Sequence, residues 1–93
     1  MIRIKRAGEF DQLLDVIAKN DLEMFDLVNA KIKLFKKNPN DTRLDNHPLK
    51  RRMRGKWAFS ITEDIRIVYI WQGEKRVRFL NIGPHSKVYS RAD

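Results

Sequence analysis

The chain has 93 residues, no cysteine, and 20 lysines and arginines against 12 acidic residues, which gives a formal net charge of +8. Its length allows one small domain, residues 1–93, and the lack of cysteine excludes disulfides, thiolate zinc sites and a cysteine nucleophile. The basic surplus suits a polyanionic partner such as nucleic acid, an anionic membrane or an acidic protein, although a solvated basic surface would have the same composition.

The first half of the chain predicts one strand followed by two helices. The N-terminal MIRIKRAGEF has no apolar signal segment and no later stretch is long enough to span a membrane, so we expect a cytoplasmic protein without a membrane partner. The alternating residues IRIK at 2–5 predict the strand. Apolar residues recur on one helical face over residues 10–17 and again over 22–35, with Asn20 or Asp21 as the N-cap of the second helix.

The second half of the chain predicts three antiparallel strands. Apolar or aromatic residues alternate with other types at 57–62, 65–71 and 76–82, and the short turns TED and QGEK join these segments. The order of strand, helical hairpin and three-stranded meander predicts an α+β domain with both helices packed on one face of the sheet.

Arg66 interrupts the apolar run in EDIRIVYIW, where a fully buried charge costs several kcal/mol unless it is paired. Either the face of the sheet that the helices leave free is wet at this point, or an anion comes to it. Ser60 and Arg78 fall on or near the same face if the strands alternate regularly, although the sequence does not fix their register.

The segment RLDNHPLKRRMRGKW at 43–57 is strongly basic. Its cations, opposed only by Asp45, are Arg43, Lys50, Arg51, Arg52, Arg54 and Lys56. Such segments bind phosphates because each cation neutralises one phosphate and releases condensed counterions. We therefore expect phosphate contacts here, with a solvated loop as the alternative.

The C-terminal segment NIGPHSKVYSRAD at 81–93 has a sharp Gly-Pro turn after the last strand. The turn carries several polar side chains beyond the edge of the sheet, namely His85, Lys87, Tyr89 and Arg91. Lys87 adds a cation to those of the basic segment, whereas Tyr89 taken alone would equally suit packing of the C-terminus.

His47 and His85 are the only histidines of the chain. The surrounding positive charge disfavours a divalent cation, so we expect no metal site and no cofactor. Imidazoles ionise near neutral pH and a guanidinium is permanently charged, which together favour acid–base cleavage of a phosphodiester. RNA carries its own nucleophile, the 2′-hydroxyl, so the enzyme needs only a base, an acid and a fixed cation.

Four segments, HPL, RGKWAFSI, DIRIVY and IGPHSKVY, together resemble the RelE/ParE superfamily of bacterial type II toxin–antitoxin toxins, and within it the histidine-bearing YafQ-like branch. The resemblance covers nearly the whole chain. It implies a small α+β ribonuclease that cuts mRNA on the ribosome without a metal. It also implies a cognate antitoxin that covers the basic face, with operator DNA bound only through the antitoxin.

The resemblance also assigns roles to residues of this chain. The positions that match catalytic residues of the branch are His47, Asp64, Arg66, His85 and Tyr89. The histidines match acid–base groups, Arg66 matches the cation that steadies the transition state, and Tyr89 matches an aromatic residue that orients the substrate. We expect Arg66 and His85 to converge on one concave, positively charged patch.

Two positions depart from the branch. Ser60 stands where the branch carries a further histidine, and Asn81 where it carries an arginine, so Arg78 or Lys87 would have to replace one phosphate contact. The related ParE branch has the same fold, inhibits DNA gyrase and lacks the nuclease residues, which makes it an alternative that the retained residues disfavour. The other alternative is an inactive relative that only binds an antitoxin.

Overall fold

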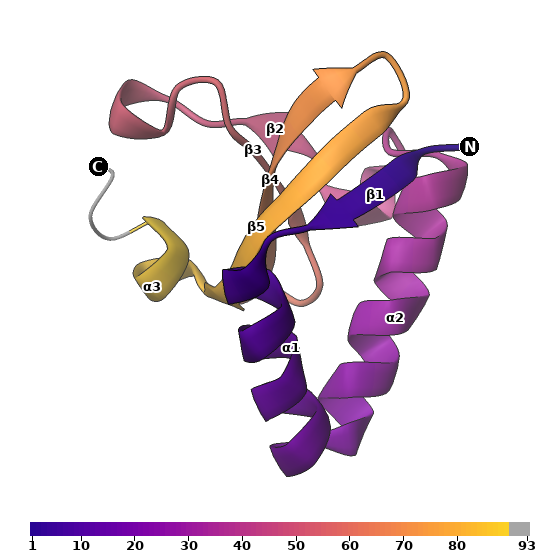
Figure 1. The fold of residues 1–93 in the computed structure, drawn as a ribbon, viewed down its shortest axis with the longest axis vertical. Coiled ribbons are helices and arrows are strands. Elements are labelled where there is room, and N and C mark those ends of the chain that lie inside the picture. The colour runs from indigo at the N-terminus through magenta and orange to yellow at the C-terminus, as the bar shows by residue number, and fades with distance from the viewer. Residues whose placement is uncertain (90–93) are drawn as a thin grey trace.

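A computed structural model describes residues 1–89 of the chain, without the side chains of Lys87 and Tyr89. Its helices and strands follow the chain in the order β1 (Arg3–Arg6), α1 (Gly8–Asn20), α2 (Leu22–Lys37), β2 (His47–Pro48), β3 (Trp57–Ser60), β4 (Ile65–Gly73), β5 (Arg76–Pro84) and α3 (His85–Tyr89). Two single 3₁₀ turns, η1 (Thr42–Leu44) and η2 (Arg51–Met53), flank β2. Figure 1 shows these elements as one body.

The sheet has five strands in the order β1-β5-β4-β3-β2. Strands β3, β4 and β5 form the predicted antiparallel meander. Strand β1 is parallel to β5 and β2 is antiparallel to β3, so the sheet is mixed. The predicted α+β fold is confirmed. The structure adds β2 and α3, which are too short to produce a periodic pattern in the sequence.

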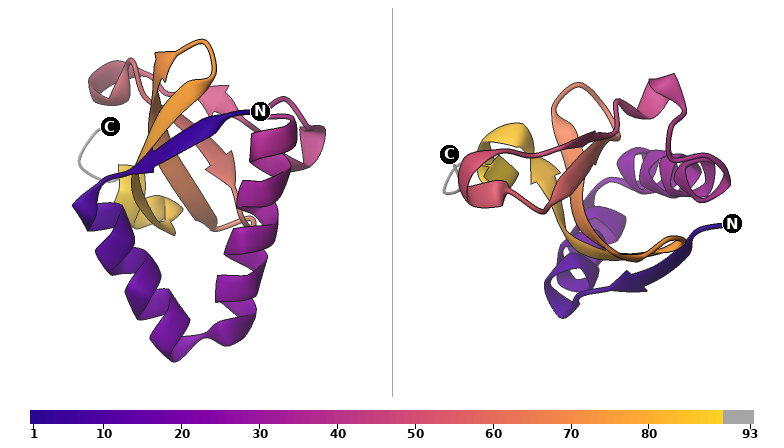
Figure 2. Two further views of the ribbon diagram at one scale, coloured as in Figure 1. Left: turned by 45° about the vertical axis from the view of Figure 1, so that its right-hand side comes forward. Right: turned by 90° about the horizontal axis from the view of Figure 1, so that it is seen from above.

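Helices α1 and α2 form a hairpin on one side of the sheet. Its closed end, at residues 20–21, lies beyond the sheet, and the two helices diverge from it toward the strands (Figures 1 and 2). Of the two predicted N-caps of α2, Asn20 and Asp21, the structure has Asp21. Its carboxylate accepts a hydrogen bond from the Met24 N–H at 3.0 Å. The side chains that the hairpin buries are Phe10, Leu14, Val28 and Phe35.

An aromatic cluster fills the space between the hairpin and the sheet. Phe35 stacks on Phe59 with ring centroids 4.5 Å apart, and the rings of Tyr69 and Phe79 contact both. All four side chains are fully buried. Because side chains alternate along a strand, this cluster turns Ser60 on β3 and Arg66 on β4 to the opposite face.

That opposite face is partly covered. The loop carrying η2 and the helix α3 pack on it through a small apolar cluster of Met53, Ala58, Val68 and Val88, bordered by Leu49 and Leu80. The sequence predicts that the face of the sheet opposite the helices is uncovered. This is correct around Arg78, which is exposed, and wrong in the middle of the sheet, where the small apolar cluster covers the strands. The reason is that the basic segment carries an apolar residue, Met53, which anchors it on the strands. Within residues 1–89, no helix has both the length and the apolar composition that crossing a membrane requires.

Candidate active site

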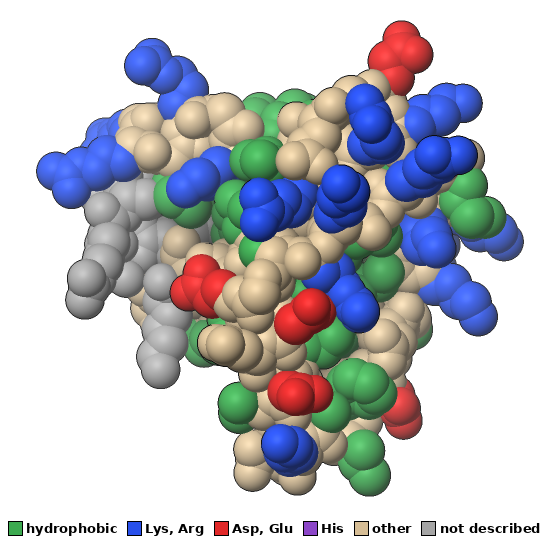
Figure 3. Space-filling model, viewed as in Figure 1, with side chains coloured by type: hydrophobic (Ala, Val, Ile, Leu, Met, Phe, Trp, Pro, Cys, Tyr) green, Lys and Arg blue, Asp and Glu red, His purple; other side chains and the backbone are tan. Residues whose placement is uncertain are grey.

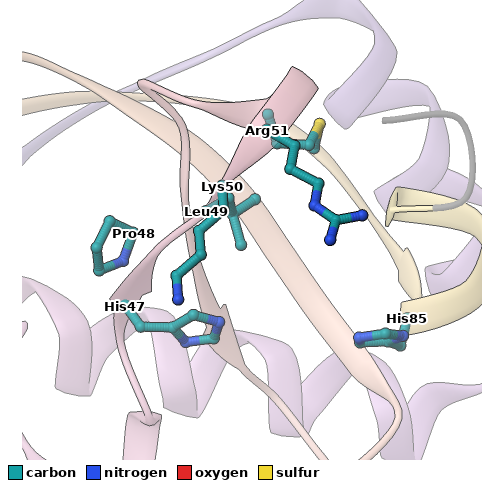
Figure 4. A pocket seen from close by; sticks show the side chains of 7 residues that line it. His47, Pro48, Leu49, Lys50, Arg51 and His85 are labelled. Carbon is teal, nitrogen blue, oxygen red and sulfur yellow. The ribbon is translucent and has the colours of Figure 1, made fainter. Parts of the chain in front are cut away.

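His47 and His85 line one hollow of about 460 Å³ at the edge of the sheet. His47 comes from β2 and His85 from the first position of α3, and Figure 4 shows the two imidazoles pointing toward each other across the space between them. Lys50 and Arg51 reach into the same hollow from the η2 loop (Figure 4). The fold therefore brings His85 to a histidine and two cations that lie more than 30 residues earlier in the sequence.

The segment before β2 fixes the position of His47. Asp45 adopts a left-handed backbone conformation, with φ of 48°, and its carbonyl oxygen lies 2.7 Å from His47 Nδ1. Because a carbonyl oxygen only accepts hydrogen bonds, Nδ1 carries the proton and Nε2 of the neutral ring has a free lone pair. The next residue, Asn46, accepts a hydrogen bond at 2.6 Å from the hydroxyl of Tyr69, whose side chain is fully buried. His47 is thus fixed by its own bond to Asp45 and by the anchoring of the preceding residue, Asn46, to the core.

The backbone of β4 fixes the position of His85. The His85 N–H donates to the Asp64 carbonyl oxygen at 2.8 Å, and the preceding Pro84 pairs with Ile65 in the register of β4 and β5. The predicted Gly-Pro turn after residue 82 is wrong, because β5 continues through Gly83 and Pro84, which pair with Arg66 and Ile65 of β4. The short helix α3 begins directly after them, at His85.

The basic segment is a closed and ordered loop. The Leu49 N–H donates to the Lys56 carbonyl at 2.8 Å across its base, and Met53 anchors its tip on the sheet. Arg51 has a left-handed conformation with φ of 57°, which costs a residue with a side chain about 1–2 kcal/mol. The exposed cations that the loop presents are Lys50, Arg51, Arg52 and Arg54, whereas Lys56 is half-buried.

Arg66 lies beside this hollow rather than in it. In the sheet it is opposite Ser60 on β3 and Gly83 on β5, and its guanidinium donates to the Ser60 hydroxyl. The guanidinium lines a second hollow of about 360 Å³ near the turn between β3 and β4. Its Nε is buried and has no hydrogen-bond partner among the described residues. The expected convergence of Arg66 and His85 on one concave patch is therefore not what the structure shows: their side chains line separate hollows, although Gly83, opposite Arg66, is only two residues from His85.

The remaining predicted site residues are scattered around the two hollows. The Asp64 side chain is exposed and lines neither hollow. Arg78 is exposed on β5, opposite Ile70. Arg43 lines the second hollow, but its guanidinium makes two hydrogen bonds of 2.9 and 2.8 Å to the Asp41 carboxylate. These bonds lower the pKa of Asp41 to about 2.

The predictions for Arg91 and for the side chains of Lys87 and Tyr89 lie outside what the structure describes. Asn81, the second departure from the family pattern, is opposite Val68 in the sheet, and its side-chain oxygen is buried without a partner among the described residues. Sequence reasoning missed Asn46 and Tyr69, because they are 23 positions apart and neither residue type marks a site. Residues 1–89 contain no group of three or more histidines or acidic residues placed to bind a metal ion.

Known proteins share the fold of this chain. Residues 2–90 match the family model for the bacterial toxin of type II toxin–antitoxin systems, YafQ. A YoeB/ParE toxin from Agrobacterium tumefaciens has a similar structure, with 24% identity and a TM-score of 0.78 over 90% of this chain and 99% of its own. YafQ from E. coli strain BL21(DE3) has 19% identity and a TM-score of 0.76 over 96% of this chain and 99% of its own.

A chain of the E. coli DinJ–YafQ complex is also similar, with 19% identity and a TM-score of 0.69 over 96% of this chain and 99% of its own. No curated protein sequence matches this chain. At these identities the solved structures establish the fold, whereas the match over residues 2–90 establishes the family.

Proposed function

The chain belongs to the YafQ family of bacterial type II toxin–antitoxin toxins, and we propose that it is an endoribonuclease that cuts mRNA on the ribosome and so inhibits translation. The observation that carries this proposal is the hollow in which His47 and His85 face each other beside Lys50 and Arg51. Two imidazoles across a cationic hollow suit a phosphodiester, since one can act as base and the other as acid while fixed cations balance the phosphate charge.

The reaction begins with proton transfer from the RNA 2′-hydroxyl to Nε2 of His47, which has a free lone pair because Nδ1 is bonded to the Asp45 carbonyl. The 2′-oxygen then attacks the adjacent phosphorus. As the bond from phosphorus to the 5′-oxygen breaks, His85 donates a proton to that oxygen. The products are a 2′,3′-cyclic phosphate and a free 5′-hydroxyl, and no metal takes part.

The cations act on the charge that develops on the phosphate. Lys50 and Arg51 line the hollow with the histidines. Arg66 lines the neighbouring hollow, where its guanidinium donates to the neutral Ser60 hydroxyl and would pair with a phosphate oxygen that enters there. Asp64 and Tyr89 keep the supporting roles that the family implies. The other cations of the loop and its surroundings, Arg43, Arg52, Arg54, Lys56, Arg78 and Lys87, bind the RNA backbone.

The same surface suits a cognate antitoxin. E. coli YafQ forms a complex with DinJ, and an acidic segment of an equivalent partner would be drawn to the loop cations of this chain. The antitoxin would block the hollow and carry any contact with operator DNA. We place both activities in the cytoplasm, where ribosomes and mRNA are available.

The function is tested by primer extension on a reporter mRNA, with and without ribosomes, using this protein and its His85→Ala and His47→Ala variants. We expect cuts only with the unaltered protein and ribosomes together, and a loss of at least about a hundredfold in rate for each variant. Lys19→Ala, an exposed cation at the end of α1, is the control and should cut normally. Cutting that survives both histidine variants would refute the mechanism, and gyrase-dependent DNA breaks with intact mRNA would assign the chain to the gyrase inhibitors.

A further inference from the structure

A second group of cations lies on the sheet at its other edge, away from the histidine hollow. In the parallel pairing of β1 with β5, Arg3 is opposite Arg76 and Lys5 is opposite Arg78. The alternating residues Ile4 and Val77 pack against the core under the helices, so the four cations point to the opposite face. We call Arg3, Lys5, Arg76 and Arg78 the cation ladder.

The cation ladder is unusual because like charges directly opposite each other destabilise a sheet. Neighbouring strands are about 4.8 Å apart and every second residue of a strand recurs after roughly 6.6 Å, so four positive groups share a very small area. All four residues are exposed, and none of their side chains has a hydrogen bond or an ion pair with any residue from 1 to 89. Arg6, the next residue of β1, differs because it is paired with Asp11 at 3.1 Å.

A glycine at the end of β4 leaves room for the Arg76 side chain of the cation ladder. A Cβ atom on Gly73, at the end of β4, would lie 3.3 Å from Nε and from one terminal nitrogen of Arg76, so the guanidinium rests against the bare glycine. The turn between β4 and β5 adds Lys75, while Glu74 is the single acidic residue there. Five cations against one carboxylate leave four positive charges, which is half of the formal net charge of +8.

The cation ladder and the histidine hollow occupy different parts of the surface. Figure 3 shows Lys and Arg side chains gathered over β1 and the adjoining turn, with no histidine on the face that is drawn. In the sheet, β1 and β2 are the two edge strands, and three strands separate them. A partner that contacts both the cation ladder and the hollow is therefore held at two distant points, which fixes its orientation.

We propose that the cation ladder binds the phosphate backbone of ribosomal RNA and so orients the toxin on the ribosome, a role that rests on the proposed function. The partner is a polyanion because the four cations lack partners of their own and would gain them from successive phosphates. RNA is favoured over an acidic polypeptide because the four ladder residues are all cations at regular spacing on two paired strands, and regularly spaced phosphates serve to position a protein without reading sequence.

The test compares two double variants in a His85→Ala background, which prevents cleavage. Arg3→Gln with Arg76→Gln removes one rung of the ladder. The control, Arg6→Gln with Lys19→Gln, removes the same charge from a cation that is already paired and from a distant exposed one. Binding to 70S ribosomes that carry a short mRNA is measured from 50 to 300 mM salt, and thermal unfolding is measured in parallel.

The ladder variant should bind ribosomes several-fold more weakly, with a salt dependence reduced by about 1.4–1.8 in log–log slope, since each of the two lost phosphate contacts contributes close to 0.7–0.9. Its Tm should rise by about 1–8 °C because one like-charge pair has been removed. The control should keep the original slope. If the ladder residues only supported the fold, removing one rung would not leave the protein more stable and, at the same time, weaken its binding to ribosomes.

Equal salt slopes for the two variants would overturn the proposal. So would an unchanged ribosome affinity together with lost binding to poly-glutamate, since the surface would then serve an acidic protein. The result is independent of catalysis: if the unaltered protein fails to cut mRNA but its ribosome binding still depends on the ladder, the proposed function falls and the docking role stands.

Discussion

The hydrogen bond from Tyr69 to Asn46 joins the core of the protein to the residue beside His47, and the substitution Tyr69→Phe tests it. The change keeps the ring among its aromatic neighbours and removes only the hydroxyl, which donates at 2.6 Å. A hydrogen bond of this kind contributes about 0.5–1.5 kcal/mol to stability. In the variant, the side-chain oxygen of Asn46 also loses its donor, and because Asn46 is half-buried, water replaces that donor only in part. We expect a loss of about 1–2 kcal/mol in the free energy of unfolding, or roughly 4–16 °C in Tm for a domain of this size.

The same residue makes the effect dependent on pH. Burial raises the pKa of the Tyr69 phenol above its ordinary value. Below about pH 10 both the folded and the unfolded chain hold the phenolic proton, so the stabilising contribution is complete. Above that pH the unfolded chain loses the proton first, and stability falls by about 1.4 kcal/mol for each pH unit. Tyr69→Phe lacks this loss.

Urea denaturation of both proteins at pH 8 and pH 11 measures the two effects together. The unaltered protein should be more stable by about 1–2 kcal/mol at pH 8, and this advantage should have nearly disappeared at pH 11. The variants Asn46→Ala and the double substitution complete a thermodynamic cycle, in which the two single effects should not add. A difference that is the same at both pH values, or two single effects that add, would refute the reasoning.

Three further predictions concern other parts of the molecule. Phe35→Ala should cost about 3–5 kcal/mol in urea denaturation, because a fully buried ring that stacks at 4.5 Å on Phe59 is lost; a cost below 1 kcal/mol would contradict the packing. Arg51→Gly should raise the unfolding free energy by up to about 1 kcal/mol, because φ of 57° suits glycine, whereas Arg54→Gly, with φ of −55°, should lower it. Asp41→Asn should free Arg43 and make ribosome binding tighter and more salt-dependent, and unchanged binding would show that Arg43 does not contact RNA.

The parts of the fold that the sequence predicts are those with a long periodic pattern. Helices α1 and α2 and strands β3 to β5 each carry enough alternating or helical apolar residues to be recognised locally. Strand β2 has two residues and acquires its conformation from pairing with β3. The parallel pairing of β1 with β5 joins residues more than 70 positions apart, which no local pattern reveals.

The candidate site divides in the same way. Composition identifies the residue types, since two histidines and a basic segment are conspicuous in a short chain. Their arrangement depends on tertiary structure: the hollow exists because Met53 packs the basic loop onto the sheet and because the His85 N–H is bonded to the Asp64 carbonyl oxygen. The direction of the Arg66 side chain also depends on tertiary structure. Arg66 lies between Ser60 and Gly83 in the sheet, and its guanidinium bonds to Ser60 because only Ser60 has a side-chain hydrogen-bond acceptor.

The bond between Arg66 and Ser60 bears on how the two hollows work together. A neutral hydroxyl holds a guanidinium much less strongly than a carboxylate does, and the Arg66 Nε has no partner among the described residues. Arg66 is paired with Ser60 across the sheet, and His47 is paired with Ala58. Because Ser60 and Ala58 are two residues apart on β3, these two cross-strand pairs are separated by about 7 Å along the strand. A phosphate that contacts Arg66 would offer the guanidinium a charged acceptor in exchange for a neutral one. Under the proposed function, serine at position 60, where the YafQ-like pattern has histidine, positions the guanidinium through a neutral hydroxyl and leaves its charge to be balanced by the substrate phosphate.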